Sequence, residues 1–298
     1  MKKIIVLLMV VCMAVSLFSG LTFATAKPIG IVLSTLDNPF FVTLRDGAAA
    51  RAKKLGCQLI VLDSQNDSAK ESSNMEDLIQ QKVGAILVNP VDSDAVVNAV
   101  KAANNAKIPV LTIDRTANGG SVVTHIASDN IAGGKMAGEY IVKLLKGKGK
   151  VVEIQGTPGA SAARDRGKGF DGVIAKTPGI KIVAQQEAGF DRQKGLTVME
   201  NILQAQPVIN AIFCQNDEMA LGAIKAIQSA KRTGIIVVGF DATDDGVKAI
   251  NAGLMTGTIA QQPAMIGSMG IDNAVNVMKG KKVPAAIPVA LKLIIKTK

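Results

Sequence analysis

The few aromatic residues of this chain stand in short polar motifs that could bind a polyhydroxylated molecule. The sequence has no Trp, one Tyr and eight Phe. Four of the Phe lie in Asn38-Pro39-Phe40-Phe41, Phe190-Asp191 and Phe240-Asp241. A core prefers to bury aromatic surface among aliphatic neighbours, so rings beside Asn and Asp predict flat apolar walls edged by hydrogen-bonding groups. Such walls suit a sugar, because rings cover its C–H faces while polar groups pair with its hydroxyls.

Two series of elements must position these motifs, and the first occupies the amino-terminal part of the chain. Short runs rich in β-branched residues predict strands at Ile29–Leu33, Gln58–Leu62, Ala85–Val88 and Val110–Ile113. Apolar residues at helical spacing predict helices between them, over Phe41–Leu55, Ala69–Gln81 and Ala95–Ala106. Short apolar strands that alternate with such helices indicate a parallel sheet buried on both faces.

A second series of the same kind follows Ser128. Its predicted strands are Val151–Ile154, Ile180–Gln185, Ala211–Cys214 and Ile235–Gly239. Its predicted helices are Ile131–Leu145, Ala162–Lys176, Gln193–Gln204, Met219–Ser229 and Asp244–Asn251. The predicted fold class is therefore α/β, with two doubly wound parallel-sheet domains in tandem.

Each polar motif falls just past the carboxyl end of a predicted strand, as do Asn89-Pro90, Asp114-Arg115 and Gln215-Asn216-Asp217. Open α/β sheets bind ligands in the crevice outside these ends, since helix N-termini and free backbone groups converge there. Motifs from both halves of the chain therefore point to one cleft. The alternative is that such residues are helix N-caps, and we favour this for Asp94, Asp191 and Asp217.

The first 26 residues have the pattern of an export signal. Lys2 and Lys3 form a positive start, Ile4 to Leu21 is almost wholly apolar, and Ala24-Thr25-Ala26 fits the site of signal peptidase. A membrane anchor is the competing interpretation, because the apolar run approaches the length of a spanning helix. The small residues at its exit and the absence of a positively charged stop favour a signal peptide over residues 1–26 and export to a periplasm.

The remaining 272 of the 298 residues exceed the usual size of one domain, and a chain with 48% hydrophobic residues can build two cores. Loss of Lys2 and Lys3 lowers the net charge from +10 to +8. This excess is dispersed, so we expect a solvated surface and no nucleic-acid partner. Cys57 and Cys214 lie among apolar neighbours on strands of different domains, which favours buried free thiols over a disulfide.

A series of motifs runs in order from about Ile29 to Lys296. They are Ser34-Thr-Leu-Asp-Asn38-Pro-Phe-Phe41, Asp114-Arg115, Ala127-Ser-Asp-Asn130, Ser161-Ala-Ala-Arg-Asp-Arg166, Gly189-Phe-Asp-Arg192, Gln215-Asn-Asp-Glu-Met219, Val238-Gly-Phe-Asp241 and Ile259-Ala-Gln261. Together they closely resemble the ribose-binding proteins, the soluble receptors of sugar ABC transporters within the type I periplasmic binding protein family.

The resemblance implies two α/β domains joined by a three-segment hinge. The crossings would lie near Ser128, near Gln261-Gln262 and near Ala290, and a last strand over Ala290–Ile295 would return to the second domain. The N-terminal domain would then comprise residues 27–128 plus 262–289. The C-terminal domain would comprise residues 129–261 plus 290–298.

The resemblance also implies that Phe40 and Phe41 face Phe190 across a bound sugar, with Phe240 alongside. The polar groups that it carries over are Asn38, Asp114 and Arg115 from the first domain and Arg166, Asn216, Asp241 and Gln261 from the second. Ser34 is a marginal contact. Asp37 departs from the family motif, which often has Asn at this place.

The charges of these residues support a neutral ligand. The carboxylates of Asp114 and Asp241 balance the guanidiniums of Arg115 and Arg166, and such groups engage adjacent hydroxyls in pairs. A carboxylate or phosphate ligand would need an uncompensated cation. From spacing alone, ordinary salt bridges between domains stay an alternative.

Signals for catalysis are weak. The one His, His125, alternates with apolar residues in Val122–Ala127 and fits a strand residue better than a catalytic base. The G-x-G-x-x-G match at Gly167–Gly172 follows helical residues rather than a strand, so a dinucleotide site there is not indicated. No Walker A loop, paired-cysteine motif or His-Glu-x-x-His motif occurs. We expect no enzyme activity, no cofactor and no metal.

The resemblance implies an exported, monomeric receptor that binds D-ribose, closes around it and delivers it to a membrane ABC permease, with a chemoreceptor as a further partner. Alternative ligands are allose, galactose, xylose or a furanose-like signal molecule. Two other classes stay open. One is the sensor half of a sugar-responsive transcription repressor, which would carry a helix-turn-helix in place of the export signal. The other is an exported α/β enzyme that acts on sugars.

Overall fold

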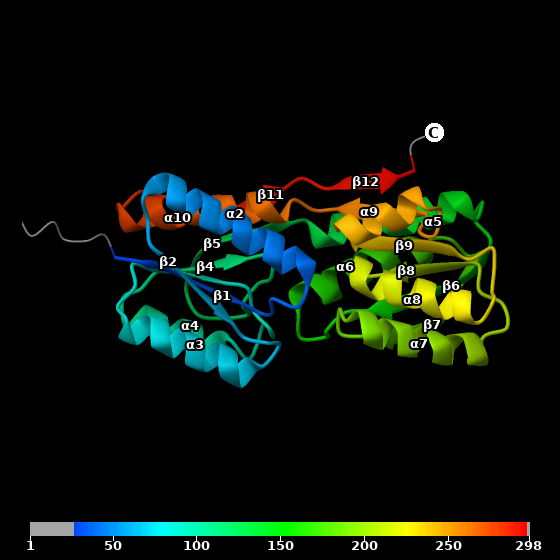
Figure 1. Ribbon diagram of the computed structural model, residues 1–298, viewed down its shortest axis with the longest axis horizontal. Helices are drawn as coiled ribbons and strands as arrows, with labels where there is room; N and C mark the ends of the chain where they lie inside the picture. The colour runs from blue at the N-terminus through cyan, green and yellow to red at the C-terminus, as the bar shows by residue number, and fades with distance from the viewer. Residues whose placement is uncertain (1–26, 297–298) are drawn as a thin grey trace, which may run out of the picture.

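The computed structural model describes residues 27–296, which form two α/β units (Figure 1). The predicted signal peptide, residues 1–26, lies outside the described residues. The first unit consists of β1 (Ile29–Leu33), α2 (Pro39–Leu55), β2 (Leu59–Asp63), α3 (Ser68–Gln80), β3 (Ala85–Val88), α4 (Val97–Asn105), β4 (Val110–Ile113), β5 (Val122–Ser128), α10 (Pro263–Met278) and β11 (Ala286–Val289).

The second unit repeats this alternation of strand and helix. It consists of α5 (Asn130–Leu144), β6 (Gly149–Gln155), α6 (Ser161–Ile174), β7 (Ile180–Glu187), α7 (Arg192–Ala205), β8 (Ala211–Cys214), α8 (Asp217–Ser229), β9 (Ile236–Asp241), α9 (Asp244–Asn251), β10 (Gly257–Ala260) and β12 (Lys292–Ile295). The predicted fold class of two doubly wound α/β domains is confirmed.

The two six-stranded sheets share one topology. The strand order is β2-β1-β3-β4-β5-β11 in the first sheet and β7-β6-β8-β9-β10-β12 in the second. The sequence predicts parallel sheets, and this is wrong at one edge, since β12 runs antiparallel to β10. The reason is geometric: β10 leads out of the second unit and β12 returns into it, so the two neighbours must run in opposite directions.

Helices cover both faces of each sheet, which explains why the strands are continuous apolar runs. In the first unit, α2 and α10 pack on one face, and α3 and α4 pack on the other. In the second unit, α7, α8 and α9 oppose α5 and α6. The helices thus enclose each sheet, whose carboxyl edge is turned toward the other unit (Figure 1).

The chain passes between the units three times. The passages connect β5 to α5, β10 to α10 and β11 to β12, close to the predicted crossings near Ser128, Gln261-Gln262 and Ala290. The predicted last strand does lie in the second sheet, as β12. The domain bounds of 27–128 plus 262–289 and 129–261 plus 290–298 stay a prediction.

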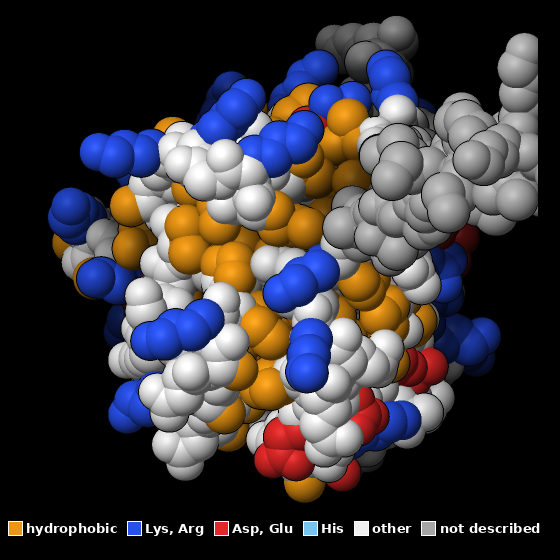
Figure 2. Space-filling model, turned by 90° about the vertical axis from the view of Figure 1, so that its left-hand side faces the viewer, with side chains coloured by type: hydrophobic (Ala, Val, Ile, Leu, Met, Phe, Trp, Pro, Cys, Tyr) orange, Lys and Arg blue, Asp and Glu red, His pale blue; other side chains and the backbone are white. Residues whose placement is uncertain are grey.

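The basic side chains are dispersed over the surface. Figure 2 shows Lys and Arg side chains spread over the visible end of the first unit without forming a single stripe.

Cys57 and Cys214 are free thiols, as predicted. Cys214 is buried on β8, whereas Cys57 is only half-buried and lies between α2 and β2, so its predicted place on a buried strand is wrong. Within residues 27–296, no helix combines the length and apolar character needed to cross a membrane.

Candidate functional site

A small cavity of about 10 Å³ lies where the carboxyl edges of the two sheets meet. Ten of the eleven predicted site residues line it, together with one unpredicted residue, Ala162. From the first unit come Asn38, Phe40, Phe41, Asp114 and Arg115, and from the second come Arg166, Phe190, Asn216 and Asp241, with Gln261 on the passage between β10 and α10. The ten residues therefore lie together at one cavity, and their role in binding a ligand stays a prediction.

Phe240 is the predicted site residue that does not line the cavity. Its ring is fully buried, and the guanidinium of Arg166 lies over it at 3.8 Å from the ring centre. Because β9 alternates its side chains between the two faces of the sheet, Phe240 and Asp241 cannot both face the cavity. Phe240 supports Arg166 from the side of the helices α5 and α6.

Aromatic rings and guanidiniums form the walls of the cavity. Phe40 and Phe41 meet edge to face, with ring centres 5.1 Å apart. The guanidinium of Arg115 lies 5.2 Å from the ring of Phe41 and 5.3 Å from that of Phe190 in the other unit. The Arg115 cation thus contacts one ring from each unit, and a cation over an aromatic ring is attracted by the negative face of the ring.

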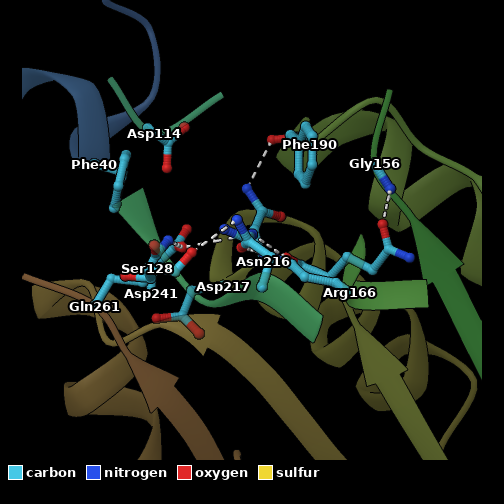
Figure 3. Close-up of polar contacts among 12 residues, drawn as sticks. Phe40, Asp114, Ser128, Gly156, Arg166, Phe190, Asn216, Asp217, Asp241 and Gln261 are labelled. Atoms are coloured by element: carbon cyan, nitrogen blue, oxygen red, sulfur yellow. Dashed lines mark hydrogen bonds and ion pairs between the residues drawn. The ribbon is translucent and has the colours of Figure 1, made fainter. Parts of the chain in front are cut away.

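The guanidinium of Arg166 has several partners in the second unit (Figure 3). It donates from Nε to Oδ1 of Asn130 at 2.8 Å and from Nη1 to the carbonyl oxygen of Gln215 at 2.6 Å. Its Nη1 also lies 3.7 Å from Oδ1 of Asp241. Asn130 and Gln215 stand in the sequence motifs, but nothing in their residue types distinguishes such supporting groups from residues that line the cavity.

Each carboxylate of the cavity is held by an amide side chain. Asp114 Oδ2 accepts a hydrogen bond from Asn89 Nδ2 at 3.1 Å, and Asp241 Oδ1 accepts one from Gln261 Nε2 at 2.8 Å. Burial raises the pKa of Asp241, and Arg166 opposes this rise. Burial also lowers the pKa of Arg166, and Asp241 opposes this fall. Arg115 and Arg166 both keep their charge, because the pKa of a guanidinium lies far above neutral pH.

Several buried polar atoms at the cavity form no hydrogen bond with the described residues. They are Asp114 Oδ1, Arg115 Nε and Gln261 Oε1, and Ser34 Oγ and Ser128 Oγ share this property. An unpaired buried polar atom is costly, so such atoms are rare in folded proteins. Acceptors and a donor that lack partners at one cavity are ready to pair with the hydroxyls of a ligand.

Three residues of the cavity have a left-handed backbone although none is glycine. The φ angles are 62° at Asp114, 63° at Phe190 and 112° at Asp241. Such conformations persist only where the surrounding structure enforces them, and they cluster at functional sites. The unusual backbone directs these three side chains out of the strand ends and into the space between the units.

The units also touch directly beside the cavity. The backbone N–H of Thr116 in the first unit donates to Ser161 Oγ in the second at 2.9 Å. Arg164 Nη2 of the second unit donates to Ser93 Oγ of the first at 3.2 Å. These hydrogen bonds join the units without involving any residue that lines the cavity.

Candidate groups for other chemistry are sparse in the described part of the chain. Residues 27–296 contain no cluster of three or more His, Cys, Asp and Glu side chains that could hold a metal ion. His125 lies on β5, as predicted, with its Nδ1 atom 2.9 Å from the hydroxyl of Thr112. Burial lowers the pKa of this imidazole. His125 therefore belongs to the sheet and not to the cavity.

Comparisons with known proteins agree with this geometry over nearly the full chain. A family model described as a periplasmic binding protein domain matches residues 29–282. The Ribose import binding protein RbsB of Escherichia coli (strain K12) is 52% identical over 297 residues, which cover 99% of this chain and 99% of that protein. The protein of the same name from Bacillus subtilis (strain 168) is 49% identical, over 89% of this chain and 86% of its own length.

Solved structures support the same assignment. The structure of the Caulobacter myo-inositol binding protein bound to myo-inositol has a TM-score of 0.88 and 32% sequence identity to this chain. The match covers 93% of this chain and 96% of the other. The chain therefore belongs to the periplasmic binding protein family.

Proposed function

We propose that this chain is an exported receptor that binds D-ribose in the cavity between its two units. The observation that carries the proposal is the cavity itself, in which aromatic rings, balanced charges and unpaired polar atoms come from both units. Rings cover the C–H faces of a sugar, and paired acceptors and donors match its adjacent hydroxyls. Relatives named for ribose import, at 52% and 49% identity, favour ribose among the sugars.

The proposed mechanism is closure of the two units around the sugar. A ligand shifts a conformational equilibrium only by its difference in affinity for the two states. Since contact residues are divided between the units, neither unit alone can pair with all hydroxyls, and the sugar favours the arrangement in which both engage it. The three passages between the units would absorb the rotation as a hinge.

The closed receptor would deliver ribose to a membrane ABC permease and would itself catalyse no reaction. Residues 1–26 would act as a cleaved signal peptide that exports the chain to the periplasm. We expect the receptor to act as a monomer, and a chemoreceptor is a further candidate partner. An unchanged sugar after prolonged incubation with the purified chain would support a binding role over an enzymatic one.

A second candidate ligand is another sugar of similar size. The specific observation in its favour is that a structural relative at 32% identity binds myo-inositol, so the same fold accommodates different polyols. Allose, galactose, xylose or a furanose-like signal molecule would bind between the same residues.

Titration calorimetry of the purified mature chain against ribose, allose, galactose and xylose tests the ligand. We expect one site for ribose with a Kd of about 1 µM or tighter, which corresponds to about 8 kcal/mol. Small-angle scattering with and without saturating ribose tests closure, because closure must reduce the radius of gyration. If another sugar binds and ribose does not, the proposal of ribose as the ligand is wrong. If the sugar binds without a change in the radius of gyration, the hinge mechanism is excluded.

A further inference from the structure

A buried carboxylate outside the cavity joins four elements of the second unit. Asp217 is the first residue of α8, is fully buried and does not line the cavity. The sequence predicts that it caps the helix, but the structure gives this role to Asn216, whose Oδ1 accepts from the N–H of Met219 at 2.9 Å. The Asp217 carboxylate is thus available for other partners, and Figure 3 shows it turned away from the rings of Phe40 and Phe190.

The partners of this carboxylate lie in the turn that follows β9 and on the neighbouring strand β10. Asp217 Oδ2 accepts from the backbone N–H of Thr243 at 2.8 Å and from its hydroxyl at 3.2 Å. Asp217 Oδ1 accepts from the hydroxyl of Thr258 on β10 at 2.7 Å. The oxygen of that hydroxyl in turn accepts from the N–H of Ala242 at 3.3 Å. The carboxylate therefore holds two consecutive backbone amides, one directly and one through Thr258.

Two glycines leave the space that the carboxylate occupies. A Cβ atom at Gly239 on β9 or at Gly246 on α9 would overlap the carboxylate oxygens of Asp217. Neither glycine has a positive φ, so their backbone conformation does not require glycine. The absence of their side chains is explained by the close approach of Asp217.

The turn held in this way carries the Asp241 carboxylate of the cavity. Asp241 and Ala242 have φ angles of 112° and 56°, an unfavourable conformation for two consecutive residues that are not glycine. We propose that Asp217 is a positioning residue for sugar binding, which holds this turn and thereby sets the Asp241 carboxylate beside Arg166 and Gln261. This inference rests on the proposed function for its ligand.

Amide hydrogen exchange of the sugar-free chain tests the first step, because it requires no ligand. In Asp217→Ala we expect faster exchange at Ala242 and Thr243 than in the wild type. Asp217→Asn should be affected less, since its Oδ1 can still accept from Thr243. Unchanged exchange at both amides in Asp217→Ala overturns the inference, whichever sugar the chain binds.

A double-mutant cycle on the ribose Kd tests the second step. Asp217→Ala should weaken binding about tenfold or more, as expected when buried hydrogen-bonding groups lose their partners. If Asp217 acts through Asp241, adding Asp217→Ala to Asp241→Ala causes little further loss, whereas independent effects would multiply. Wild-type affinity in Asp217→Ala, or multiplied losses in the cycle, overturns the inference.

A pair of threonine variants keeps the test decisive if Asp217→Ala does not fold. Thr258→Val removes the hydroxyl that joins Asp217 to Ala242 and should weaken ribose binding. Thr256→Val is the matched control, because its hydroxyl accepts from the N–H of Val237 near the start of β9, four residues before Asp241. Equal affinities in the two variants contradict the inference. If the wild-type chain binds no ribose, the proposed ligand is wrong, and the same variants are titrated with the sugar that does bind.

Discussion

The backbone N–H of Ser93 in the first unit donates a hydrogen bond to the carbonyl oxygen of Gly159 in the second, with the two atoms 2.9 Å apart. A Cβ atom at Gly159 would overlap the side chain of Asp92, whose Oδ1 accepts from the N–H groups of Asp94 and Ala95. Neither Ser93 nor Gly159 lines the cavity. A side chain at position 159 would therefore have to displace Asp92 from this contact between the units.

Gly159→Ala should weaken the binding of every sugar by the same factor. The added methyl group opposes the contact between the units, and overpacking of this kind costs about 1–3 kcal/mol, or roughly fivefold to 150-fold in Kd. Titration with two different sugars measures the factor. Gly172→Ala in α6 is the control, because a Cβ atom there meets nothing within 4 Å. Unchanged affinity in Gly159→Ala would show that sugar binding does not require this contact.

Phe190→Ala should weaken ribose binding by about 1.5–3 kcal/mol, the value of burying a Phe side chain. Its ring forms one wall of the cavity and lies 5.3 Å from the guanidinium of Arg115 and 5.8 Å from that of Arg166. Phe190→Leu keeps apolar volume but loses the flat face, so we expect an intermediate affinity. Calorimetry gives the affinities, and thermal unfolding without sugar shows whether each variant is folded. Wild-type affinity in Phe190→Ala would mean that sugar binds elsewhere.

Asp114→Ala should cost at least as much as Phe190→Ala. The substitution removes an acceptor atom that has no partner within residues 27–296, and it leaves the buried guanidinium of Arg115 without its nearest carboxylate, 3.8 Å away. Asp114→Asn keeps the side-chain volume and one acceptor atom. We expect its affinity for ribose to lie between those of the wild type and Asp114→Ala. A smaller loss in Asp114→Ala than in Phe190→Ala, measured by calorimetry, would contradict this order.

Glu71 should make the sugar-free chain less stable as the pH rises. Its Oε1 accepts from the N–H of Val91 at 2.8 Å, while its buried Oε2 forms no hydrogen bond with the described residues. Burial raises its pKa from 4.5 to about 7, against the opposing effects of the Val91 bond and Arg115, and Asp92 adds to the rise. Because the folded-state pKa is the higher one, the stabilisation is complete below about pH 4.5 and is lost through about pH 7.

Urea unfolding between about pH 5 and pH 8 measures this contribution. A pKa of about 7 against 4.5 corresponds to roughly 3 kcal/mol in the free energy of unfolding. In Glu71→Gln this part of the decline should be absent. Burial also raises the pKa of Asp217 to about 6 and that of Asp241, and both contribute equally to wild type and variant. If the free energy of unfolding changes with pH in the same way in the wild type and in Glu71→Gln, the assignment to Glu71 is wrong.

The sequence predicts the central strands better than the strands next to the passages between the units. The predicted bounds of β1, β3, β4 and β8 agree with the structure, because these central strands are short, fully buried and composed mainly of apolar residues. β10, β11 and α10 were not predicted from periodicity. β10 is short and begins with Gly257, and β11 contains Pro288, which only an edge strand tolerates.

The distinction between helix caps and site residues could not be predicted from residue type. Asp191 does cap α7, as predicted, whereas Asp94 and Asp217 cap no helix. Asn38 and Asn216 perform both roles, since each caps a helix and lines the cavity. Asn and Asp have the same hydrogen-bonding capacity in either role, so only the three-dimensional arrangement separates them.

The place of α10 in the first unit has a consequence for the order of folding. Ile266, Ile271 and Ala274 of this helix complete the core that α2 forms on the first sheet, although more than 130 residues of the second unit separate α10 from β5. Contacts between segments so distant in the sequence form slowly, because a long loop must close first. During synthesis, which begins at the amino terminus, the apolar face of α2 therefore stays exposed until residue 278 has been added. The unit that is synthesised first therefore stays incomplete until nearly all of the second unit has been synthesised.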